Sequence, residues 1–412
     1  MNKTTRILAV LMFTLLLVPA AQATNGTNLI GIGPISRAMG GGGVAAPQDA
    51  VSAIFANPAA VCFGPFCPGS SVDFAGTYFD PTVNGKIENF GAPGALSGES
   101  KLNPFMVPAI GVSIPINPRW RFGIGMFGVS GLGADYKGTS IYPTQGVTPP
   151  TGWPVYTQLQ TMKFAPNLAW LITDNFSVGG SLEIVWQNLD LGQGSSHGYT
   201  AGLQIGALYK IGQFQLGGSY TTPESVTHKN VANLDPQTGG TWDDLKIESP
   251  QTFKLGVAWV PGTTWLVELN TKWYGWGSAD GYSDFGWDDQ WVFGIGAQWR
   301  PIDKWAFRLG YNYGETPIKK NNNFSLNPAA TTPVQGKNVP TGFYEVLRIV
   351  GFPAIAEQHF TAGVGYDITE NLILNLSLMY SPEETFTETS GPVTIEASLK
   401  EWSTTFGLTL LF

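Results

Sequence analysis

The sequence predicts an all-β fold, a 14-stranded antiparallel transmembrane β-barrel with an N-terminal plug in its lumen. From Ser71 onward, apolar and polar residues alternate with a period of two in segment after segment, which indicates strands with one apolar face. The connections alternate between very short turns and longer loops, as they do in bacterial outer-membrane barrels. Residues 24–69 lack this alternation and are rich in glycine and small apolar residues, so they predict a separate element.

Residues 1–23 have the order of a secretory signal peptide. Lys3 and Arg6 precede an apolar run at 7–18, and the small residues of 21–23 follow it, which is the charged, hydrophobic and cleavage-site order of an export signal. A single transmembrane helix is the alternative, but the run is shorter than the roughly 20 residues that a bilayer span needs. We therefore expect the mature protein to begin at Thr24 and to leave the cytoplasm.

The composition is unusual for a soluble protein. Only 13% of the residues are charged, compared with about 25% in average soluble domains. Removal of the signal peptide takes away two positive charges and changes the formal net charge from -8 to -10. An acidic exported chain without a basic stripe is a poor nucleic-acid binder, so we expect no nucleic-acid partner.

Residues 24–69 are predicted to form a hatch, a plug that fills the barrel lumen. The tetraglycine run at 40–43 allows tight packing and bending, and the segment carries few charges, among them Arg37 and Asp49. Cys62 and Cys67 follow at its end, and an oxidising compartment favours a local disulfide between them. A zinc site is the alternative, but two thiolates without a nearby histidine do not complete a tetrahedral shell.

Residues 70–412 are predicted to form the barrel. The last segment shows the pattern well, because Trp402, Phe406 and Leu410 share one face while Glu401 and Ser403 share the other. Each segment is long enough for a tilted membrane strand. The predicted strands are 71–86, 101–115, 120–129, 158–172, 175–190, 198–211, 213–228, 246–260, 263–277, 289–301, 304–317, 357–369, 371–385 and 396–412.

The short turns place the longer loops on the outer side, because short turns belong to the periplasmic side of such barrels. Loops 130–157 and 318–356 are much the longest, and long loops are often functional. The apolar residues of the first predict a lip that attracts hydrophobic molecules: Ile141, Tyr142, Trp153 and Tyr156. The alternative is a loop folded over the barrel mouth with these side chains buried.

A soluble β-sandwich is the alternative to a membrane barrel. Aromatic residues near strand ends, such as Trp120, Trp259 and Trp299, favour the barrel, because interfacial aromatic girdles are typical of membrane barrels. The terminal Phe412 fits an outer-membrane assembly signal. Together with the export signal, these features predict a location in the bacterial outer membrane.

The sequence resembles the FadL-type outer-membrane transporters of long-chain fatty acids and other hydrophobic compounds along the mature chain. The resemblance is most specific at 36–40, Ser-Arg-Ala-Met-Gly, followed by Asp49 and then Asn57-Pro58-Ala59. These residues are similar to the family's hatch pattern of Gly-Arg-Ala-x-x-Gly, an acidic residue and Asn-Pro-Ala. The segments 304–310 and 353–363 look similar too.

The resemblance implies passive transport of long-chain fatty acids or neutral hydrocarbons. A hydrophobic molecule is caught among the outer loops, passes to an inner pocket and leaves sideways through the wall where the third strand kinks beside the hatch. In this chain the kink corresponds to a glycine-rich stretch, and glycine supplies the backbone freedom that a break in a ladder needs. Asn57, next to Pro58, would face the kink. The glycines of the stretch are Gly128, Gly131 and Gly133.

An enzyme and an open porin are the other function classes. The chain has three histidines, at 197, 228 and 359, and its Gly-x-Ser-x-Gly match at 194–198 precedes a predicted strand instead of the helix that a nucleophile elbow needs, so we expect no catalytic residues, metal or cofactor. Charged residues of both signs occupy the inward face, as in a porin lumen, although a salt-bridged scaffold that seats the hatch explains them as well. A general diffusion porin for small polar solutes therefore stays the alternative to a monomeric transporter surrounded by lipid and lipopolysaccharide.

The ligand's charge is predicted from a departure from the family. In the fatty-acid members, the resemblance implies, basic side chains near the outer end of the fifth strand and in the loop before the tenth neutralise the carboxylate. The matching positions here are near Gln193 and Ser283, which carry no charge. Since a buried carboxylate without a partner costs several kcal/mol, we expect a neutral or weakly polar hydrophobe, unless Lys137, Lys319 or Lys320 supplies the charge.

Overall fold

The computed structural model describes residues 25–61, 69–90, 93–141, 156–192, 194–235 and 242–412. The signal peptide, both cysteines and the predicted site residues Tyr142 and Trp153 lie outside these ranges. Within them, no helix has the length and apolar character that a membrane crossing requires.

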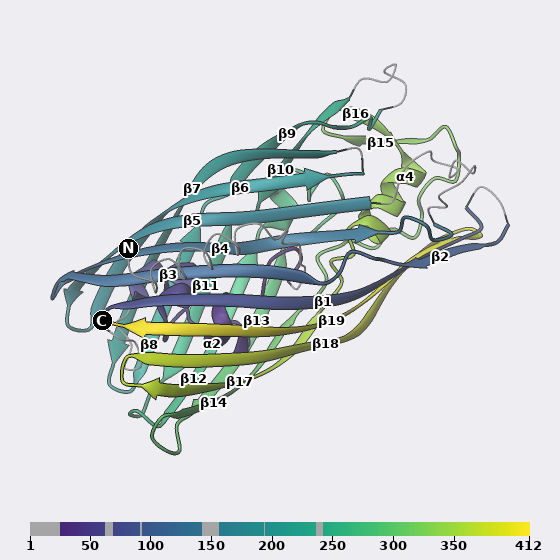
Figure 1. Cartoon of the computed structure of the whole chain (residues 1–412). Helices are drawn as coiled ribbons and strands as arrows, with labels where there is room; N and C mark the ends of the chain where they lie inside the picture. The colour runs from purple at the N-terminus through teal and green to yellow at the C-terminus, as the bar shows by residue number, and fades with distance from the viewer. Residues whose placement is uncertain (1–24, 62–68, 91–92, 142–155, 193, 236–241) are drawn as a thin grey trace, which may run out of the picture.

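Fourteen strands of the described residues form one closed antiparallel barrel, as predicted (Figure 1). The barrel closes where β1 pairs with β19 from Ser71↔Leu411 to Glu88↔Thr394. A short outer strand, β2 (Ala95–Glu99), pairs only with β1. The barrel strands are β1 (Ser71–Glu88), β3 (Phe105–Asn117), β4 (Trp120–Asp135), β5 (Tyr156–Thr173), β6 (Phe176–Asp190), β7 (Ser195–Ile211), β8 (Phe214–Thr221), β11 (Thr252–Trp259), β12 (Trp265–Tyr274), β13 (Gln290–Trp299), β14 (Trp305–Gly314), β17 (Gln358–Thr369), β18 (Leu372–Ser390) and β19 (Val393–Leu411).

The alternation of the sequence separates a lipid face from a lumen face. In β19, Trp402 is 41% exposed and Phe406 49% exposed, while Glu401 and Thr405 are buried. Aromatic rings stack between neighbouring strands near the periplasmic turns, as in the pair Trp120–Trp170 and the pair Trp265–Trp299. Such girdles mark the interfaces of a membrane barrel, so this prediction is confirmed.

Two predicted strands are each broken in two. The segment predicted as 213–228 divides into β8 and β9 (Glu224–Ala232), and the segment 246–260 divides into β10 (Asp243–Ser249) and β11. β9 and β10 pair with each other and not with the barrel. Pro223 and Pro250 stand at the two breaks, and proline cannot donate to a ladder, so a continuous pair of strands was the wrong prediction here.

The hatch, residues 25–61, lies inside the barrel (Figure 1, purple). It contains α2 (Gly33–Ala38), α3 (Ala50–Ala56) and the turn η1 (Pro58–Ala60). Proline stands in the first turn of α2, where its missing N–H costs nothing. Asp49 caps α3 by accepting from the Ser52 N–H, and Asn57 caps η1 by accepting from the Ala59 N–H.

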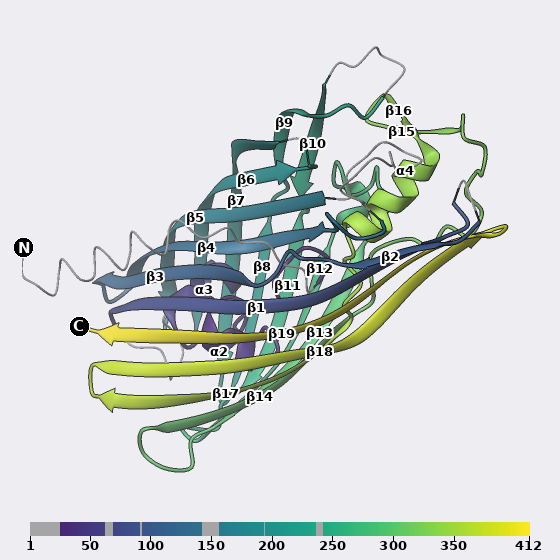
Figure 2. The same cartoon turned by 45° about the vertical axis from the view of Figure 1, so that its right-hand side comes forward.

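The outer loops fold over the barrel mouth, and a cluster of buried apolar side chains fills the space beneath them. Their elements are η3 (Trp276–Ser278), β15 (Thr331–Val334), β16 (Lys337–Pro340), α4 (Thr341–Val346) and the π-helical η4 (Leu347–Gly351). Figure 2 shows α4 beside the outer ends of β4 and β5.

The prediction that Ile141 belongs to an exposed lip is wrong, because Ile141 is buried in this outer cluster. Tyr156 is half-buried at the start of β5, and the Lys137 ammonium lies 4.2 Å from the centre of its ring. The apolar side chain of Ile141 is buried because it packs under the outer loops, as in the alternative of a folded-over loop.

Candidate functional site: a cavity and a gap in the wall

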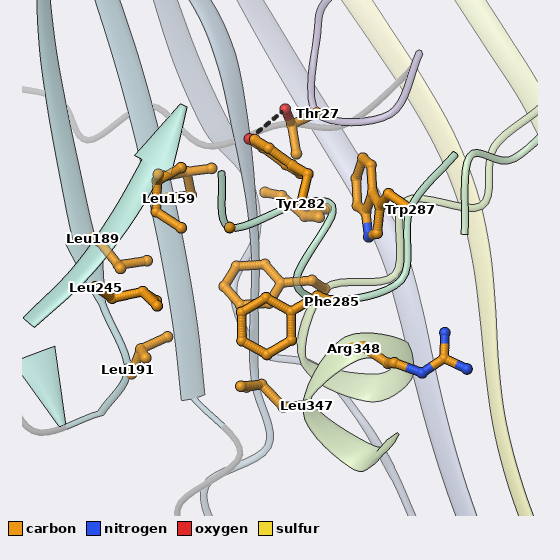
Figure 3. Close-up of a pocket in the computed structure, with 14 residues that line it drawn as sticks. Thr27, Leu159, Leu189, Leu191, Leu245, Tyr282, Phe285, Trp287, Leu347 and Arg348 are labelled. Atoms are coloured by element: carbon orange, nitrogen blue, oxygen red, sulfur yellow. Dashed lines mark hydrogen bonds between the residues drawn. The ribbon is translucent and has the colours of Figure 1, made fainter. Parts of the chain in front are cut away.

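An apolar cavity of about 40 Å³ lies between the hatch and the outer loops. Its side walls are leucines at the outer ends of neighbouring strands, Leu132 of β4, Leu159 of β5 and Leu189 of β6. Figure 3 shows the last two. These positions lie on the lumen face, which is polar along much of β5 and β6 but glycine-rich and apolar along β4. The remaining walls come from the loop after β6, from β10, from the loop after η3, and from η4 and the residue that follows it: Leu191, Leu245, Ile247, Gly281, Tyr282, Phe285, Trp287, Leu347 and Phe352.

Two hydroxyl groups at the cavity bond to each other. The oxygen atoms of Thr27 and Tyr282 lie 3.0 Å apart (Figure 3). Burial raises the pKa of the Tyr282 hydroxyl above its usual value, so the group stays protonated and can share a hydrogen bond. Neither hydroxyl adds a charge to the cavity.

Arg348 is the one charged residue that lines the cavity among the described residues. Its Nε donates to Glu345 at 2.5 Å, its Nη2 donates to Glu388 and its Nη1 donates to the Lys319 carbonyl at 2.9 Å. Burial lowers the pKa of Arg348, but the two carboxylates outweigh burial and raise it. The guanidinium points away from the leucines (Figure 3), and its charge is already paired with those two carboxylates.

Three packed aromatic rings join the cavity to the hatch. The ring centres of Trp276, Tyr282 and Trp287 lie 4.5 to 5.2 Å apart. Gly26 has a φ of 63°, and a Cβ there would lie 2.9 Å from the Trp276 ring. Glycine is therefore required at the point where the hatch begins to support these rings.

The barrel wall has a gap between β3 and β4. The ladder between them ends at Ala109↔Phe127, while β4 continues to pair with β5 beyond a register shift between Gly128 and Ser130. The shift lies in the predicted glycine stretch. A Cβ at Gly128 would lie 2.6 Å from Val107, and one at Gly133 would lie 2.4 Å from the Thr157 carbonyl, so both positions leave no room for a side chain.

The hatch covers the edge of β4 at this gap. The Leu29 N–H donates to the Val129 carbonyl and the Gly131 N–H donates to the Thr27 carbonyl, each at 3.0 Å. The Ser130 hydroxyl also donates to the Thr27 hydroxyl at 2.9 Å. Thr27 therefore contacts both the cavity, through Tyr282, and the gap.

The prediction that Asn57 faces the kink is wrong. Its Nδ2 donates to the Val44 carbonyl at 2.8 Å and to the Ala207 carbonyl of β7 at 3.0 Å, and a Cβ at Gly206 would lie 2.1 Å from its Oδ1. Pro58 lies against Gly179 of β6. The reason is that α3 contacts β3 and β4 whereas η1, which follows it, contacts β6 and β7.

Inward charged side chains hold the hatch mainly through its backbone. Glu268 of β12 accepts from four consecutive N–H groups, those of residues 43–46, at 2.8 to 3.3 Å. Lys272 donates to the Ile30 carbonyl at 2.5 Å, and Lys254 donates to the Phe55 carbonyl at 2.8 Å. The predicted salt-bridged scaffold is thus replaced in large part by bonds to the hatch main chain.

Of the two positions expected to decide the ligand's charge, one does not line the cavity and the other lies outside the described residues. Ser283 donates to the Ala279 carbonyl and is absent from the lining, and Gln193 lies outside the described residues. Lys319 pairs with Asp288 at 2.7 Å, and Lys320 lies over the Phe386 ring. Sequence reasoning missed Arg348 and the leucines, although apolar residues on an otherwise polar strand face are a readable signal.

No cluster of three potential metal ligands occurs in the part of the chain that the structure describes. The cavity offers hydrocarbon walls and a hydroxyl pair, which suit an apolar guest.

Residues 11–243 match the family model described as "Outer membrane protein transport protein (OMPP1/FadL/TodX)". Among solved structures, the chain is similar to the P. putida toluene transporter TodX, with a TM-score of 0.66 and 17% identity over 93% of this chain and 99% of that one. A Pseudomonas aeruginosa FadL homologue gives a TM-score of 0.67 at 14% identity, with the same shares covered. The Ralstonia pickettii toluene transporter TbuX gives 0.64 at 18% identity, again over 93% and 99%.

No curated protein matches the chain. The low identities to the solved structures establish the shared fold, while the family model matches more than half of the chain. The chain therefore belongs to the FadL/TodX family of transport proteins for hydrophobic compounds in the bacterial outer membrane.

Proposed function

We propose that this protein carries small neutral hydrophobic molecules passively across the outer membrane. The molecule is caught among the outer loops, occupies the cavity and leaves through the gap between β3 and β4. The observation that carries the proposal is the cavity itself. Among the described residues, its one charged lining residue, Arg348, is already paired with Glu345 and Glu388.

The cost of burying charge supports a neutral ligand. A carboxylate moved into this cavity would find leucine walls and a guanidinium that already bonds two carboxylates. Because an unpaired buried charge costs several kcal/mol, a fatty acid would have to displace one of these glutamates. A hydrocarbon meets no such penalty and gains free energy from leaving water.

The size of the cavity supports a compact ligand. Its volume is about 40 Å³, whereas a cavity of about 150 Å³ holds benzene in an engineered protein. Side chains must therefore move even for one ring. Leu347 belongs to the π-helical η4, and π-helical turns are frequent at functional sites, so this wall is a good candidate for the movement.

The contacts of Thr27 support an exit through the gap that is coupled to occupation of the cavity. Its hydroxyl lies 3.0 Å from the Tyr282 hydroxyl at the cavity and 2.9 Å from the Ser130 hydroxyl at the bulge. A ligand that displaces Tyr282 therefore disturbs a contact that closes the β4 edge. The predicted gating role of Gly128, Gly131 and Gly133 is part of this proposal, and Asn57 serves instead to hold the hatch.

An open porin is disfavoured because the hatch occupies the lumen and bonds to its inner wall. The family is one of transport channels, which supports the expectation of no catalytic activity. The hatch, the cavity and the gap all belong to one chain, which supports a monomer that contacts lipid and lipopolysaccharide on its outer face.

The test compares uptake of ethylbenzene, hexadecane and palmitate by cells that make or lack the protein. We expect the protein to enhance uptake of the neutral compounds and not of palmitate. Enhancement of palmitate alone would overturn the neutral-ligand proposal while leaving the transporter family intact.

A charge variant sharpens this test. In the double variant Glu345→Gln and Glu388→Gln, Arg348 loses both carboxylate partners, so we expect palmitate binding to rise relative to ethylbenzene. Glu315→Gln, an exposed position outside the cavity, is the matched control. Unchanged selectivity in the double variant would show that Arg348 does not decide the ligand's charge.

A further inference from the structure

The β9–β10 hairpin is attached to the barrel at two prolines and stands apart from its ladder (Figures 1 and 2). β8 ends at Thr221 and β11 begins at Thr252, which are paired with each other. Pro223 lies just after Thr221 and Pro250 lies just before Thr252, so the two prolines lie at the same height on the barrel. Beyond this level the two strands pair only with each other, as in Val226↔Ile247.

The hairpin has one apolar face and one polar face. Val226, Leu245 and Ile247 are buried, and the last two line the cavity. On the opposite face, Lys229 pairs with Asp244 at 2.6 Å, and both side chains are largely exposed. The hairpin is thus the wall that separates the ligand cavity from the outside over this sector.

The edge of the hairpin next to β7 is held by side chains. The last main-chain bond between this part of the chain and β7 runs from the Thr222 N–H to the Leu203 carbonyl, and no ladder joins β9 to β7 among the described residues. Higher up, His228 bonds through Nδ1 to the Ser196 carbonyl at 2.8 Å and through Nε2 to Gln187 at 3.0 Å.

Glycines on β7 receive the side chains of β9. A Cβ at Gly198 would lie 2.5 Å from a methyl group of Val226, and a Cβ at Gly202 would lie 2.7 Å from Glu224. Glu224 in turn pairs with Lys163 at 2.9 Å. The seam between β7 and β9 is therefore closed by side chains placed in glycine notches.

The opposite edge of the hairpin is held by its main chain. The Lys246 N–H donates to the Gln335 side chain at 2.9 Å, and the Lys246 carbonyl accepts from the same side chain at 2.8 Å. The Glu248 N–H donates to the Asp280 carbonyl at 2.9 Å. Beyond the Thr222–Leu203 bond, the β7 seam has no bond between two main chains, whereas the opposite edge has the Glu248–Asp280 bond. We therefore expect the β7 seam to open first.

A second space of about 40 Å³ lies at the foot of the hairpin, lined by Pro250, Glu224, Lys163 and Thr252 among others. Protein interiors have few voids of this size. This one leaves room for the foot of the hairpin to move without a clash between packed side chains.

We propose that the β9–β10 hairpin is an entrance flap that opens along the β7 seam and admits the neutral hydrophobe from the outside to the cavity. The proposal rests on the proposed function and adds to it the place where the ligand comes in. Leu245 and Ile247 move with the flap, so opening the seam also widens the cavity.

The test is a cross-link across the seam, the double variant Gly198→Cys and Val226→Cys in a Cys62→Ala, Cys67→Ala background. A Cβ at 198 would lie 3.9 Å from the Val226 Cβ, within the roughly 3.5–4.5 Å that a disulfide needs. We expect ethylbenzene uptake to fall to the level of cells without the protein when the pair is oxidised, and to return when it is reduced.

The matched control is Thr332→Cys with Thr341→Cys, whose hydroxyls lie 3.1 Å apart within the outer loops, with neither residue on β7 or β9. Its oxidation should leave uptake unchanged. Equal uptake by the oxidised and reduced seam variant would overturn the flap. No uptake of ethylbenzene by the unmodified protein would instead overturn the proposed function.

A second variant covers a failure of the cysteine pair to assemble. Val226→Ala empties the Gly198 notch, so the seam opens more easily, and we expect faster ethylbenzene uptake with unchanged amounts of folded protein. Uptake equal to that of the unmodified protein would count against the flap.

Discussion

The Glu268 carboxylate offers the sharpest test of how the hatch is held. Its two oxygens accept from the N–H groups of Gly43, Val44, Ala45 and Ala46. Glu268→Gln keeps the shape of the side chain, but turns one acceptor into a donor that faces the Ala46 N–H. It also removes the charge that strengthens the other three bonds.

The free-energy cost of Glu268→Gln follows from typical hydrogen-bond energies. Hydrogen bonds to charged groups contribute about 1.5–3 kcal/mol and neutral ones about 0.5–1.5 kcal/mol, and relief of the buried charge offsets part of the loss. We take a net cost of about 2 kcal/mol, which corresponds to a roughly 30-fold larger population of the open loop at 1.36 kcal/mol per factor of ten.

Hydrogen–deuterium exchange measures this population directly. We expect amides 43–46 to exchange roughly 30 times faster in Glu268→Gln, since exchange tracks local opening, while barrel amides keep their rates. Glu315→Gln, which changes the same functional group at an exposed position, should have no effect. Unchanged exchange at 43–46 would refute the reasoning, and faster exchange throughout the barrel would show a global loss of stability instead.

Three further predictions concern the hatch, the gap and the cysteines. Deleting residues 24–60 should turn a poorly conducting protein into a steady channel in planar bilayers, and high conductance of the intact protein would contradict a plugged lumen. Gly128→Val adds a side chain where even a Cβ would lie 2.6 Å from Val107, so we expect hydrocarbon uptake to fall by about tenfold or to be lost with strand pairing, with heat-modifiable gel mobility separating the two. Cys62 and Cys67 should form a local disulfide that contributes ~2 kcal/mol, and mass spectrometry that finds two free thiols would exclude it.

The sequence alone was enough to predict the barrel. Period-two alternation placed Trp402 and Phe406 on the lipid face and Glu401 on the lumen face, and the structure agrees. The strand count was also readable, because turns and loops alternate along the chain. The breaks at Pro223 and Pro250 were readable in principle, since proline inside a strand argues against a central position.

The candidate site was predicted less well. The glycine stretch at 128–133 coincides with the register shift of β4, because a bulge needs particular local residues. Asn57, by contrast, was assigned to the wrong wall, since the direction of η1 depends on how the whole hatch packs. The pairing of Arg348 with Glu388 joins residues forty positions apart and has no local signal.

Local periodicity and turn chemistry thus determined the membrane barrel, its orientation and the separate hatch, because these follow from interactions between neighbours in sequence and with lipid. Only the tertiary structure decided which charges are available to a ligand, where Thr27 meets Tyr282 and Ser130, and that β9 and β10 pair with each other and not with the barrel. Such features depend on contacts between distant segments, whose side chains meet only when the barrel closes and the hatch is seated inside it.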